Sequence, residues 1–235
     1  LGTADVDRWY EEREGNSLIN HGASVGHIPI RMELMKDPGD MIPVSDGAHR
    51  EASLGEIDAM KELLAGALKE GAIAAGFGIQ YAPATSWWEV LEMFAVAARY
   101  GAVCHVHMRG QGEIQPIDSI QGLSELIAAS AITGAGLRVV HLNSSGEGAV
   151  PRLLSLIDDA RSRGMDVTTE CYPYTAGMSP IESALYDDGW QEVMGRDYGD
   201  LEWPKTGERL TQSSFARYRE EGGMVIEHGI TPEEM

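Results

Sequence analysis

A repeat of about thirty residues is the feature that most constrains how this chain can fold. Four glycines each follow a helix-like pattern and precede an apolar run, and they stand 30, 35 and 28 residues apart. Glycine after a helix can take the left-handed conformation that ends it, and a strand with its helix takes up about 30 residues. The spacing therefore predicts a series of strand–helix units, closed by Gly71, Gly101, Gly136 and Gly164.

Helix signals fill the stretches before these glycines. Ser53 with Glu56, and Ser86 with Glu89, have the spacing of a capping box, in which each partner satisfies a free backbone N–H of the other. Apolar residues then recur at helical spacing. We expect helices around residues 57–68, 91–98, 123–131 and 153–163.

Short β-rich runs alternate with these helices, which defines an α/β fold. Their apolar residues lie on both faces over much of their length, as is typical of a parallel sheet. About five units indicate either part of a (β/α)8 barrel, which needs roughly 250 residues, or a doubly wound open sheet. The expected strands are Ala23–Met32, Ala72–Phe77, Ala102–Met108, Leu137–Leu142 and Asp166–Tyr172.

The segment after Gly189 departs from the repeat, because aromatic and charged residues are scattered along it. We expect an insertion or lid there, with a helix at Phe215–Glu221 and a strand at Gly223–Glu227. The predicted division is a partial barrel at residues 1–188, followed by the lid and the start of the last barrel unit at residues 189–235.

Charge and composition exclude several classes of function. Eighteen Lys and Arg against 37 Asp and Glu give a net charge of −19, which repels nucleic acid and anionic membranes. No apolar run reaches the roughly 18 residues of a membrane helix. Cys104 and Cys171, both in strand-like runs, do not form a disulfide framework and indicate a reducing compartment, the cytoplasm.

Polar residues end three consecutive predicted strands. His105 and His107 share a face of one strand, His141 ends the next, and Tyr172 and Tyr174 follow the third. In a barrel this rim carries the active site, and imidazoles on strands about 5 Å apart can share one zinc ion. The alternative, which we weigh equally, is that these histidines are structural residues that make hydrogen bonds and bind no metal.

Five strings of the sequence resemble, in the same order, motifs of the N-acyl-D-amino-acid deacylases, a family of the metal-dependent amidohydrolase superfamily. VGHIPIRMELM is similar to GHGALR, EGAIAAGFGIQYAP to AGALGLSTGLIYPP, and AVCHVHMRG to ATHIRDE. VVHLNSSG is similar to ISHLKAAG, and VTTECYPYTAG to VTADVYPYTAG. The resemblance implies a distorted TIM barrel of amidohydrolase type.

The resemblance also implies roles for single residues. His107 and His141 match the family's zinc-binding histidines on the fifth and sixth strands, so one or two zinc ions are the expected cofactor. Tyr174 matches a tyrosine that contacts the substrate and the transition state, and it is the expected catalytic residue. Substrate contacts are implied for Arg109, Asn143, Tyr172 and Ser179.

Two positions depart from the family. Asn143 stands where many members have lysine, and Gly110-Gln111 replaces the acidic pair that follows the position of Arg109. We therefore expect the substrate carboxylate to be held elsewhere, with Arg109 as the visible candidate. A structural pairing of Arg109 with an acid of the barrel is the equal alternative.

The family's other reactive groups lie outside these motifs. An HxH pair and a bridging Cys precede them, and the catalytic Asp ends the eighth strand. The resemblance therefore implies that this sequence is the middle of a longer enzyme and that this segment by itself is inactive. The expected reaction is zinc-dependent hydrolysis of the amide of a small-molecule N-acyl amino acid, of D configuration, in a possible homo-oligomer. Still open are a cyclic-amide amidohydrolase of dihydroorotase or hydantoinase type and a truncated barrel that only binds.

Overall fold

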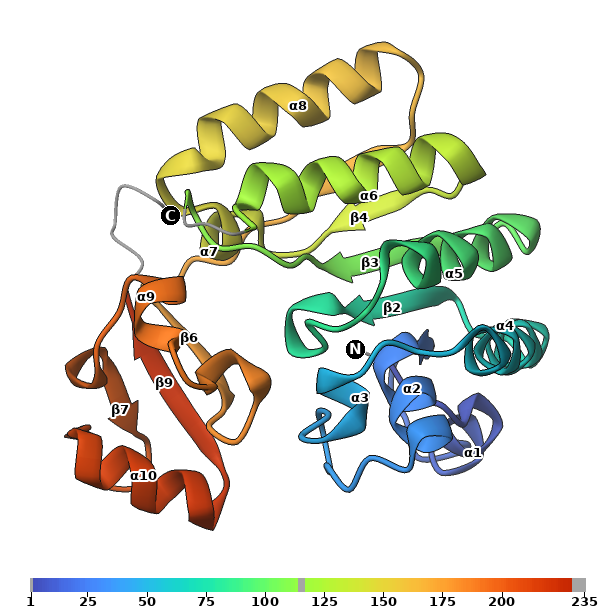
Figure 1. Ribbon diagram of the computed structural model, residues 1–235. Coiled ribbons are helices and arrows are strands. Elements are labelled where there is room, and N and C mark those ends of the chain that lie inside the picture. The colour runs from blue at the N-terminus through green and yellow to red at the C-terminus, as the bar shows by residue number, and fades with distance from the viewer. Residues whose placement is uncertain (1, 114–116, 230–235) are drawn as a thin grey trace.

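A five-stranded parallel sheet forms the first and larger unit of the fold in the computed structural model, which describes residues 2–113 and 117–229 (Figure 1). The strands lie in the order β1-β2-β3-β4-β5, so each pairs with the next along the chain. A doubly wound sheet reverses its strand order, whereas this consecutive order is that of a barrel wall. The described residues do not close it into a barrel. The strands are β1 (Ser24–Gly26), β2 (Ala74–Gly78), β3 (Val103–His107), β4 (Leu137–Val139) and β5 (Val167–Thr169).

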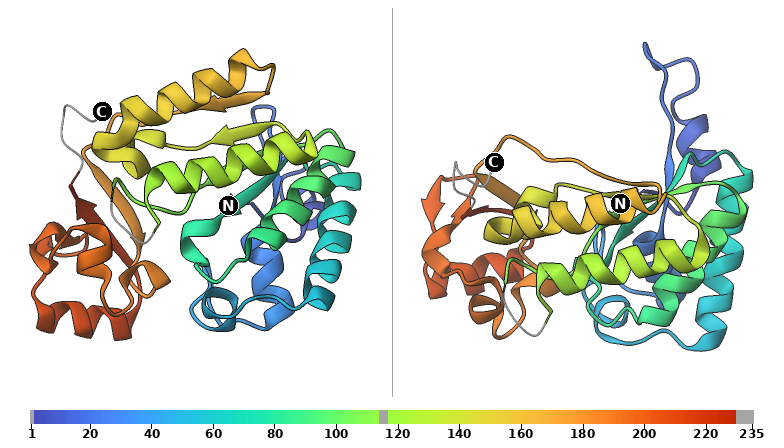
Figure 2. Two further views of the ribbon diagram at one scale, coloured as in Figure 1. Left: turned by 45° about the horizontal axis from the view of Figure 1, so that its top comes forward. Right: turned by 90° about the horizontal axis from the view of Figure 1, so that it is seen from above.

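Helices cover the outer face of this sheet (Figures 1 and 2). The long ones are α4 (Leu54–Lys69), α5 (Trp87–Arg99), α6 (Ser119–Thr133) and α8 (Val150–Ser162). The shorter ones are α1 (Val6–Glu11), α2 (His27–Met35), α3 (Asp46–His49) and α7 (Leu142–Gly146). The strand residues facing the helices are buried in one apolar core, among them Val25, Phe77, Val106, Val139 and Val167. Among the described residues, no helix has the length and apolar character needed to cross a bilayer.

The repeat predicted from the glycines is confirmed, with one shift. Gly71, Gly101 and Gly164 follow their helices with φ of 105°, 66° and 83°, in the left-handed region that glycine enters most easily. At the third helix the left-handed residue is Gly134, with φ of 79°, and not Gly136. Gly136 instead lies at the start of β4, where its carbonyl oxygen accepts a hydrogen bond from Cys104.

The run expected as the first strand, Ala23–Met32, is mostly helical, so the strand prediction is wrong beyond Gly26. Helix α2 begins at His27, directly after β1. Pro29 stands in its first turn, where a missing N–H breaks no intrahelical hydrogen bond. The buried residues follow a helical spacing, and include Ile28, Met32 and Met35.

The second unit is a four-stranded antiparallel sheet in the order β6-β9-β7-β8. Its strands are β6 (Ala176–Pro180), β7 (Leu201–Trp203), β8 (Glu208–Arg209) and β9 (Met224–His228), and its helices are α9 (Trp190–Met194) and α10 (Gln212–Glu221). It has its own core, half of whose buried residues are aromatic: Tyr186, Trp190, Trp203, Phe215 and Tyr218.

The expected division after residue 188 falls inside this second unit. Strand β6 already pairs with β9, which lies more than forty residues later in the sequence, and long-range pairing of this kind leaves no mark in local composition. The expected helix and strand near the C-terminus are present as α10 and β9. The start of a last barrel unit, expected at residues 230–235, lies outside the described residues.

Candidate active site

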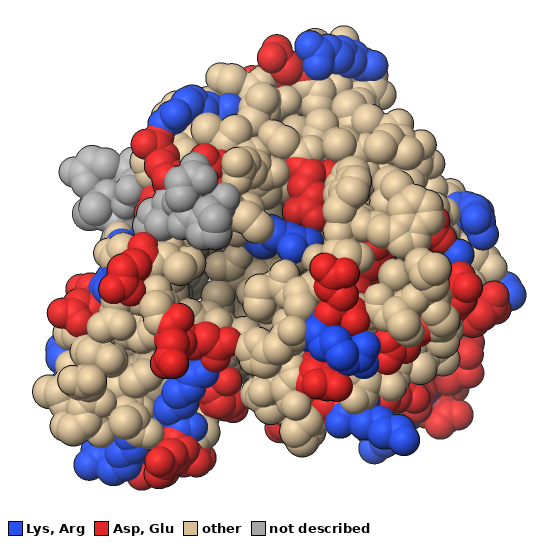
Figure 3. Space-filling model, viewed as in Figure 1, with Lys and Arg blue, Asp and Glu red and all other residues tan. Residues whose placement is uncertain are grey.

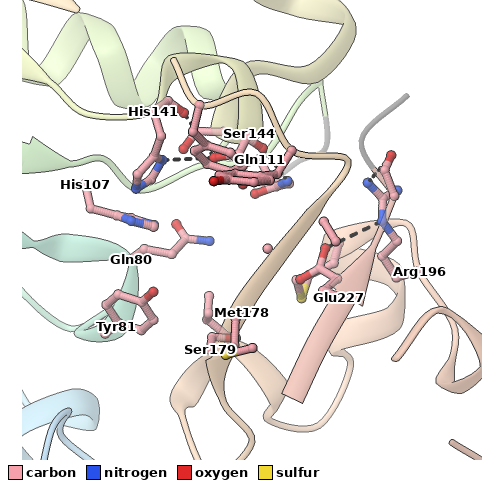
Figure 4. Close-up of a pocket in the computed structure, with 18 residues that line it drawn as sticks. Gln80, Tyr81, His107, Gln111, His141, Ser144, Met178, Ser179, Arg196 and Glu227 are labelled. Atoms are coloured by element: carbon pink, nitrogen blue, oxygen red, sulfur yellow. Dashed lines mark hydrogen bonds and ion pairs between the residues drawn. The ribbon is translucent and has the colours of Figure 1, made fainter. Parts of the chain in front are cut away.

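A pocket of about 330 Å³ lies between the carboxyl ends of the parallel strands and the second unit (Figures 3 and 4). That volume is within the range of small-molecule sites. The first unit contributes residues that end or follow β3, β4 and β5, and the second unit faces them across the pocket. The residues used below are Tyr81, His107, Gln111, His141, Ser144, Tyr172, Tyr174, Ser179, Arg196 and Glu227.

Aromatic rings form a continuous row along the strand ends. The ring centroids of Tyr81 and His107 are 5.1 Å apart, and those of His107 and His141 are 4.4 Å apart. His141 and Tyr172 follow at 5.9 Å, and Tyr172 and Tyr174 at 5.9 Å. The row therefore runs across the rim of the sheet, from the end of β2 to the segment after β5.

The two histidines of this row are held close together and uncharged. Their rings are inclined at 71°. Burial, helped by the neighbouring His141, lowers the pKa of His107 to about 3. Burial also lowers the pKa of His141, against a smaller opposite effect of Glu170. Neutral imidazole is the form that binds a metal, so both side chains are ready to act as ligands at neutral pH.

A strained backbone and one hydroxyl group fix the orientation of His141. The residue has φ of 34° and ψ of 55°, a left-handed conformation that is unusual for a residue other than glycine. The Ser144 hydroxyl donates to the His141 carbonyl oxygen at 3.0 Å and lies 2.9 Å from Nδ1. When its one proton lies on the carbonyl, the hydroxyl accepts from Nδ1–H, and that tautomer leaves the lone pair of Nε2 free for a metal.

By itself, the histidine pair could fill only part of a metal site. Zinc in proteins takes four ligands, with about 2.0–2.1 Å to each imidazole nitrogen. Within residues 2–113 and 117–229, no group of three or more His, Cys, Asp or Glu side chains is placed to hold a metal ion. His107 and His141 therefore fit two positions of a tetrahedral site.

Two residues expected to contact the substrate do not line the pocket. Arg109 donates to the Thr85 carbonyl oxygen at 2.8 Å and pairs with Glu125 at 2.9 Å. Asn143 is buried, and its amide donates to the carbonyl oxygen of Tyr172 at 3.0 Å. Arg109 thus makes the structural ion pair that the sequence analysis gave as the alternative to substrate binding. Asn143 connects α7 to the segment that follows β5.

The other expected site residues do line the pocket. Tyr174 is 65% exposed, so its hydroxyl can reach a bound molecule. Ser179 is buried on β6, and its hydroxyl lies 2.8 Å from that of Tyr186. His105 lies on the same face of β3 as His107, but it is exposed.

Apart from Ser179, sequence reasoning missed the polar residues that the second unit contributes. Arg196 follows α9, and Glu227 lies on β9, where burial raises the pKa of its carboxyl to about 7. They stand 31 positions apart in a region without a repeat, so no local pattern relates them. Ser144 was the one missed residue with a signal, since it follows His141 by three positions at the start of a helix.

Comparisons with known proteins agree with this architecture. No family model matches the chain. The chain is 31% identical over 178 residues to the N-acyl-D-glutamate deacylase of Alcaligenes xylosoxydans xylosoxydans, a match that covers 73% of the chain and 33% of that protein. The chain spans about a third of the length of the curated relatives it matches.

Two solved structures share the fold. One is the N-acyl-D-glutamate deacylase of Bordetella bronchiseptica in complex with zinc and a phosphonate mimic of the tetrahedral intermediate, with a TM-score of 0.73 and 21% identity. It covers 98% of this chain and 48% of its own. The other is a D-aminoacylase with a binuclear metal centre, with a TM-score of 0.73 and 22% identity over 97% of this chain and 48% of its own.

The parallel sheet with its outer helices thus has the fold of part of the barrel in these solved structures. In sequence, the chain is a homologue of proteins named N-acyl-D-glutamate deacylase and D-aminoacylase, over part of their length.

Proposed function

We propose that this chain is part of a zinc-dependent hydrolase that cleaves the amide bond of N-acyl-D-amino acids. The observation that carries the proposal is the pair of neutral imidazoles, His107 and His141, 4.4 Å apart at the ends of adjacent parallel strands. Homology to a protein named N-acyl-D-glutamate deacylase supports the substrate class. A fold neighbour that holds zinc and a mimic of the tetrahedral intermediate supports the metal and the reaction.

In this proposal, His107 and His141 hold the metal through their pocket-facing nitrogens. Zinc in such sites polarises a carbonyl and lets water attack at neutral pH. Burial keeps both imidazoles unprotonated, and Ser144 keeps Nε2 of His141 free. The remaining ligands and the acid–base group come from parts of the barrel other than the described strands.

Two tyrosines and one serine complete the substrate contacts that we assign. The exposed hydroxyl of Tyr174 donates a hydrogen bond where negative charge develops on the carbonyl oxygen, which stabilises the transition state. Tyr172, next in the aromatic row, and Ser179, across the pocket, contact the bound molecule. We leave Arg109 and Asn143 out, because both are engaged in the contacts described above.

We also assign the protein to the cytoplasm, in keeping with its free cysteines. Cys104 is buried and Cys171 is exposed, and neither is in a disulfide. An exposed free thiol is typical of a reducing compartment.

The test uses the protein at its full natural length. We expect it to hydrolyse N-acetyl-D-amino acids faster than their L isomers, to lose activity with a chelator, and to regain it with zinc. His107→Ala and His141→Ala should each abolish turnover, whereas His21→Ala, an exposed histidine in the N-terminal segment, should not. Turnover of cyclic amides alone would assign the protein to the hydantoinase-like alternative.

A further inference from the structure

Three charged side chains lie where the pocket meets the second unit, and two of them, Arg196 and Glu227, line it. We call Glu147, Arg196 and Glu227 the charged wall. Glu147 follows α7, Arg196 follows α9, and Glu227 lies on β9, so the wall joins the two units. Their side chains are only 15%, 15% and 18% exposed, which means that water screens their charges weakly.

The positive charge of Arg196 is already used within the wall. Its Nη2 lies 2.6 Å from Oε1 of Glu147 and donates to the Gly229 carbonyl oxygen at 3.2 Å. The same Glu147 oxygen accepts from Nε2 of Gln111 at 2.9 Å, which fixes the carboxylate against the rim of the first unit. The charge of Arg196 is therefore balanced by a closely paired acid.

Glu227 stands on the pocket side of this pair (Figure 4). Its Oε1 is 3.6 Å from Nε of Arg196, too far for a hydrogen bond. That Nε is buried and has no hydrogen-bond partner among the described residues. The wall thus offers a bound molecule one carboxyl group, that of Glu227.

The charges of the wall do not favour a carboxylate of a bound molecule beside them. One guanidinium against two carboxylates leaves a net charge of −1, or zero when Glu227 is protonated. Among the described residues that line the pocket, the Lys, Arg, Asp and Glu side chains are those of Arg196 and Glu227. Arg196 is already paired with Glu147, so this lining has no unpaired Lys or Arg that could bind a carboxylate. A carboxylate would meet a like charge in a site of low dielectric. An amide could donate to Glu227, and an ammonium group could pair with it.

We propose that Glu227, held beside Arg196, makes the charged wall select substrates that place a neutral polar or cationic group against it and reject those that place a carboxylate there. This inference rests on the proposed function, because it names the class of N-acyl amino acid that the same pocket takes. It separates this chain from the relative named for D-glutamate.

The experiment measures kcat/KM of the full-length protein for two series of substrates. The first is N-acetyl-D-glutamate, N-acetyl-D-glutamine, N-acetyl-D-lysine and N-acetyl-D-methionine, and the second compares N-succinyl-D-methionine with N-acetyl-D-methionine. In one of the two series, we expect kcat/KM to be about tenfold or more lower for the substrate with the additional carboxylate than for its neutral or cationic counterparts. Glu227→Gln should reduce this difference by about tenfold. The matched control is Glu202→Gln, a carboxyl of the same sheet that pairs with His228 and does not line the pocket.

Binding without turnover gives a second readout. The dissociation constants of D-glutamate and D-glutamine, measured by calorimetry on the wild type and on Glu227→Gln, should change in the same direction as the rates when the wall faces the amino acid. An unchanged preference in both series and in binding, with both variants folded, would overturn the inference. A wild type that hydrolyses no N-acyl-D-amino acid would overturn the proposed function instead.

Discussion

Ser144 is the residue on which the orientation of His141 depends. Its hydroxyl is the hydrogen-bond partner of Nδ1 of His141, and such a partner fixes both the tautomer and the ring direction. We expect Ser144→Ala to weaken zinc binding by about 10–100-fold, without loss of the fold. Competition with a chelator measures it on the full-length protein. Ser124→Ala, which removes a hydroxyl bonded within α6, is the control and should bind zinc as the wild type does.

Glu227 should also make stability depend on pH. Its pKa rises from 4.5 to about 7 in the folded state, so the folded state holds the proton more tightly than the unfolded state. The resulting stability is complete below about pH 4.5 and is lost as the pH rises to about 7. We expect urea unfolding to give a few kcal/mol less stability at pH 8 than at pH 5 from this group. Glu227→Gln should lack this part of the pH dependence, and an identical pH profile would contradict the raised pKa.

Single residues were predictable from the sequence where the repeat placed them. His107 ends β3 and His141 follows the end of β4 by two positions, and the parallel register brings these segments together. Arg109 and Asn143 lie just beyond a strand end, where the two-residue alternation of a strand no longer sets the direction of a side chain. Their partners, Glu125 and the backbone of Tyr172, come from other elements.

At the scale of elements, one sequence signal gave two different structures. The Ser-x-x-Glu pattern forms a full capping box at Ser53 and Glu56, as predicted. At Ser86 only half of the box forms, because the side chain of Glu89 turns into the interior. There it lies 2.6 Å from Nε2 of His27 and bonds the guanidinium of Arg31. Its partners stand about sixty residues earlier, beyond the reach of a local pattern.

This buried cluster should matter for stability more than a surface cap. Burial by itself would raise the pKa of Glu89, yet His27 and Arg31 lower it, so the carboxylate stays charged. Glu89→Gln leaves the Arg31 charge buried without a counter-ion, and we expect a loss of about 3–5 kcal/mol in chemical unfolding. The comparison is Ser53→Ala, which removes one cap of α4 and should cost about 1 kcal/mol. Equal losses in the two variants would mean that the cluster is not specifically stabilising.

At the scale of the whole molecule, the repeat predicted the alternation of strands and helices, and the consecutive strand order decided between the two sheet types. The faces of the sheet were predicted less well. The face under the helices is apolar, whereas the inner face carries His105, Arg138 and Glu170. The strands are short and have few residues on each face, so composition does not show which face lies under the helices and which lies on the inside. The pocket needed both units, and their contact depends on tertiary packing alone.

The proposed zinc site leads to a prediction for the 235-residue chain, because the described residues supply two of its four ligands. The described residues place two imidazoles together and no third His, Cys, Asp or Glu beside them, so half of a tetrahedral zinc shell is left to solvent. A protein limited to these 235 residues should therefore bind zinc much more weakly than the full-length protein, and His107→Ala with His141→Ala should remove what binding remains. Metal analysis after dialysis against a weak chelator measures both. Tight, equimolar zinc in the 235-residue protein would contradict the assignment, because it would require a ligand set other than the histidine pair at the strand ends.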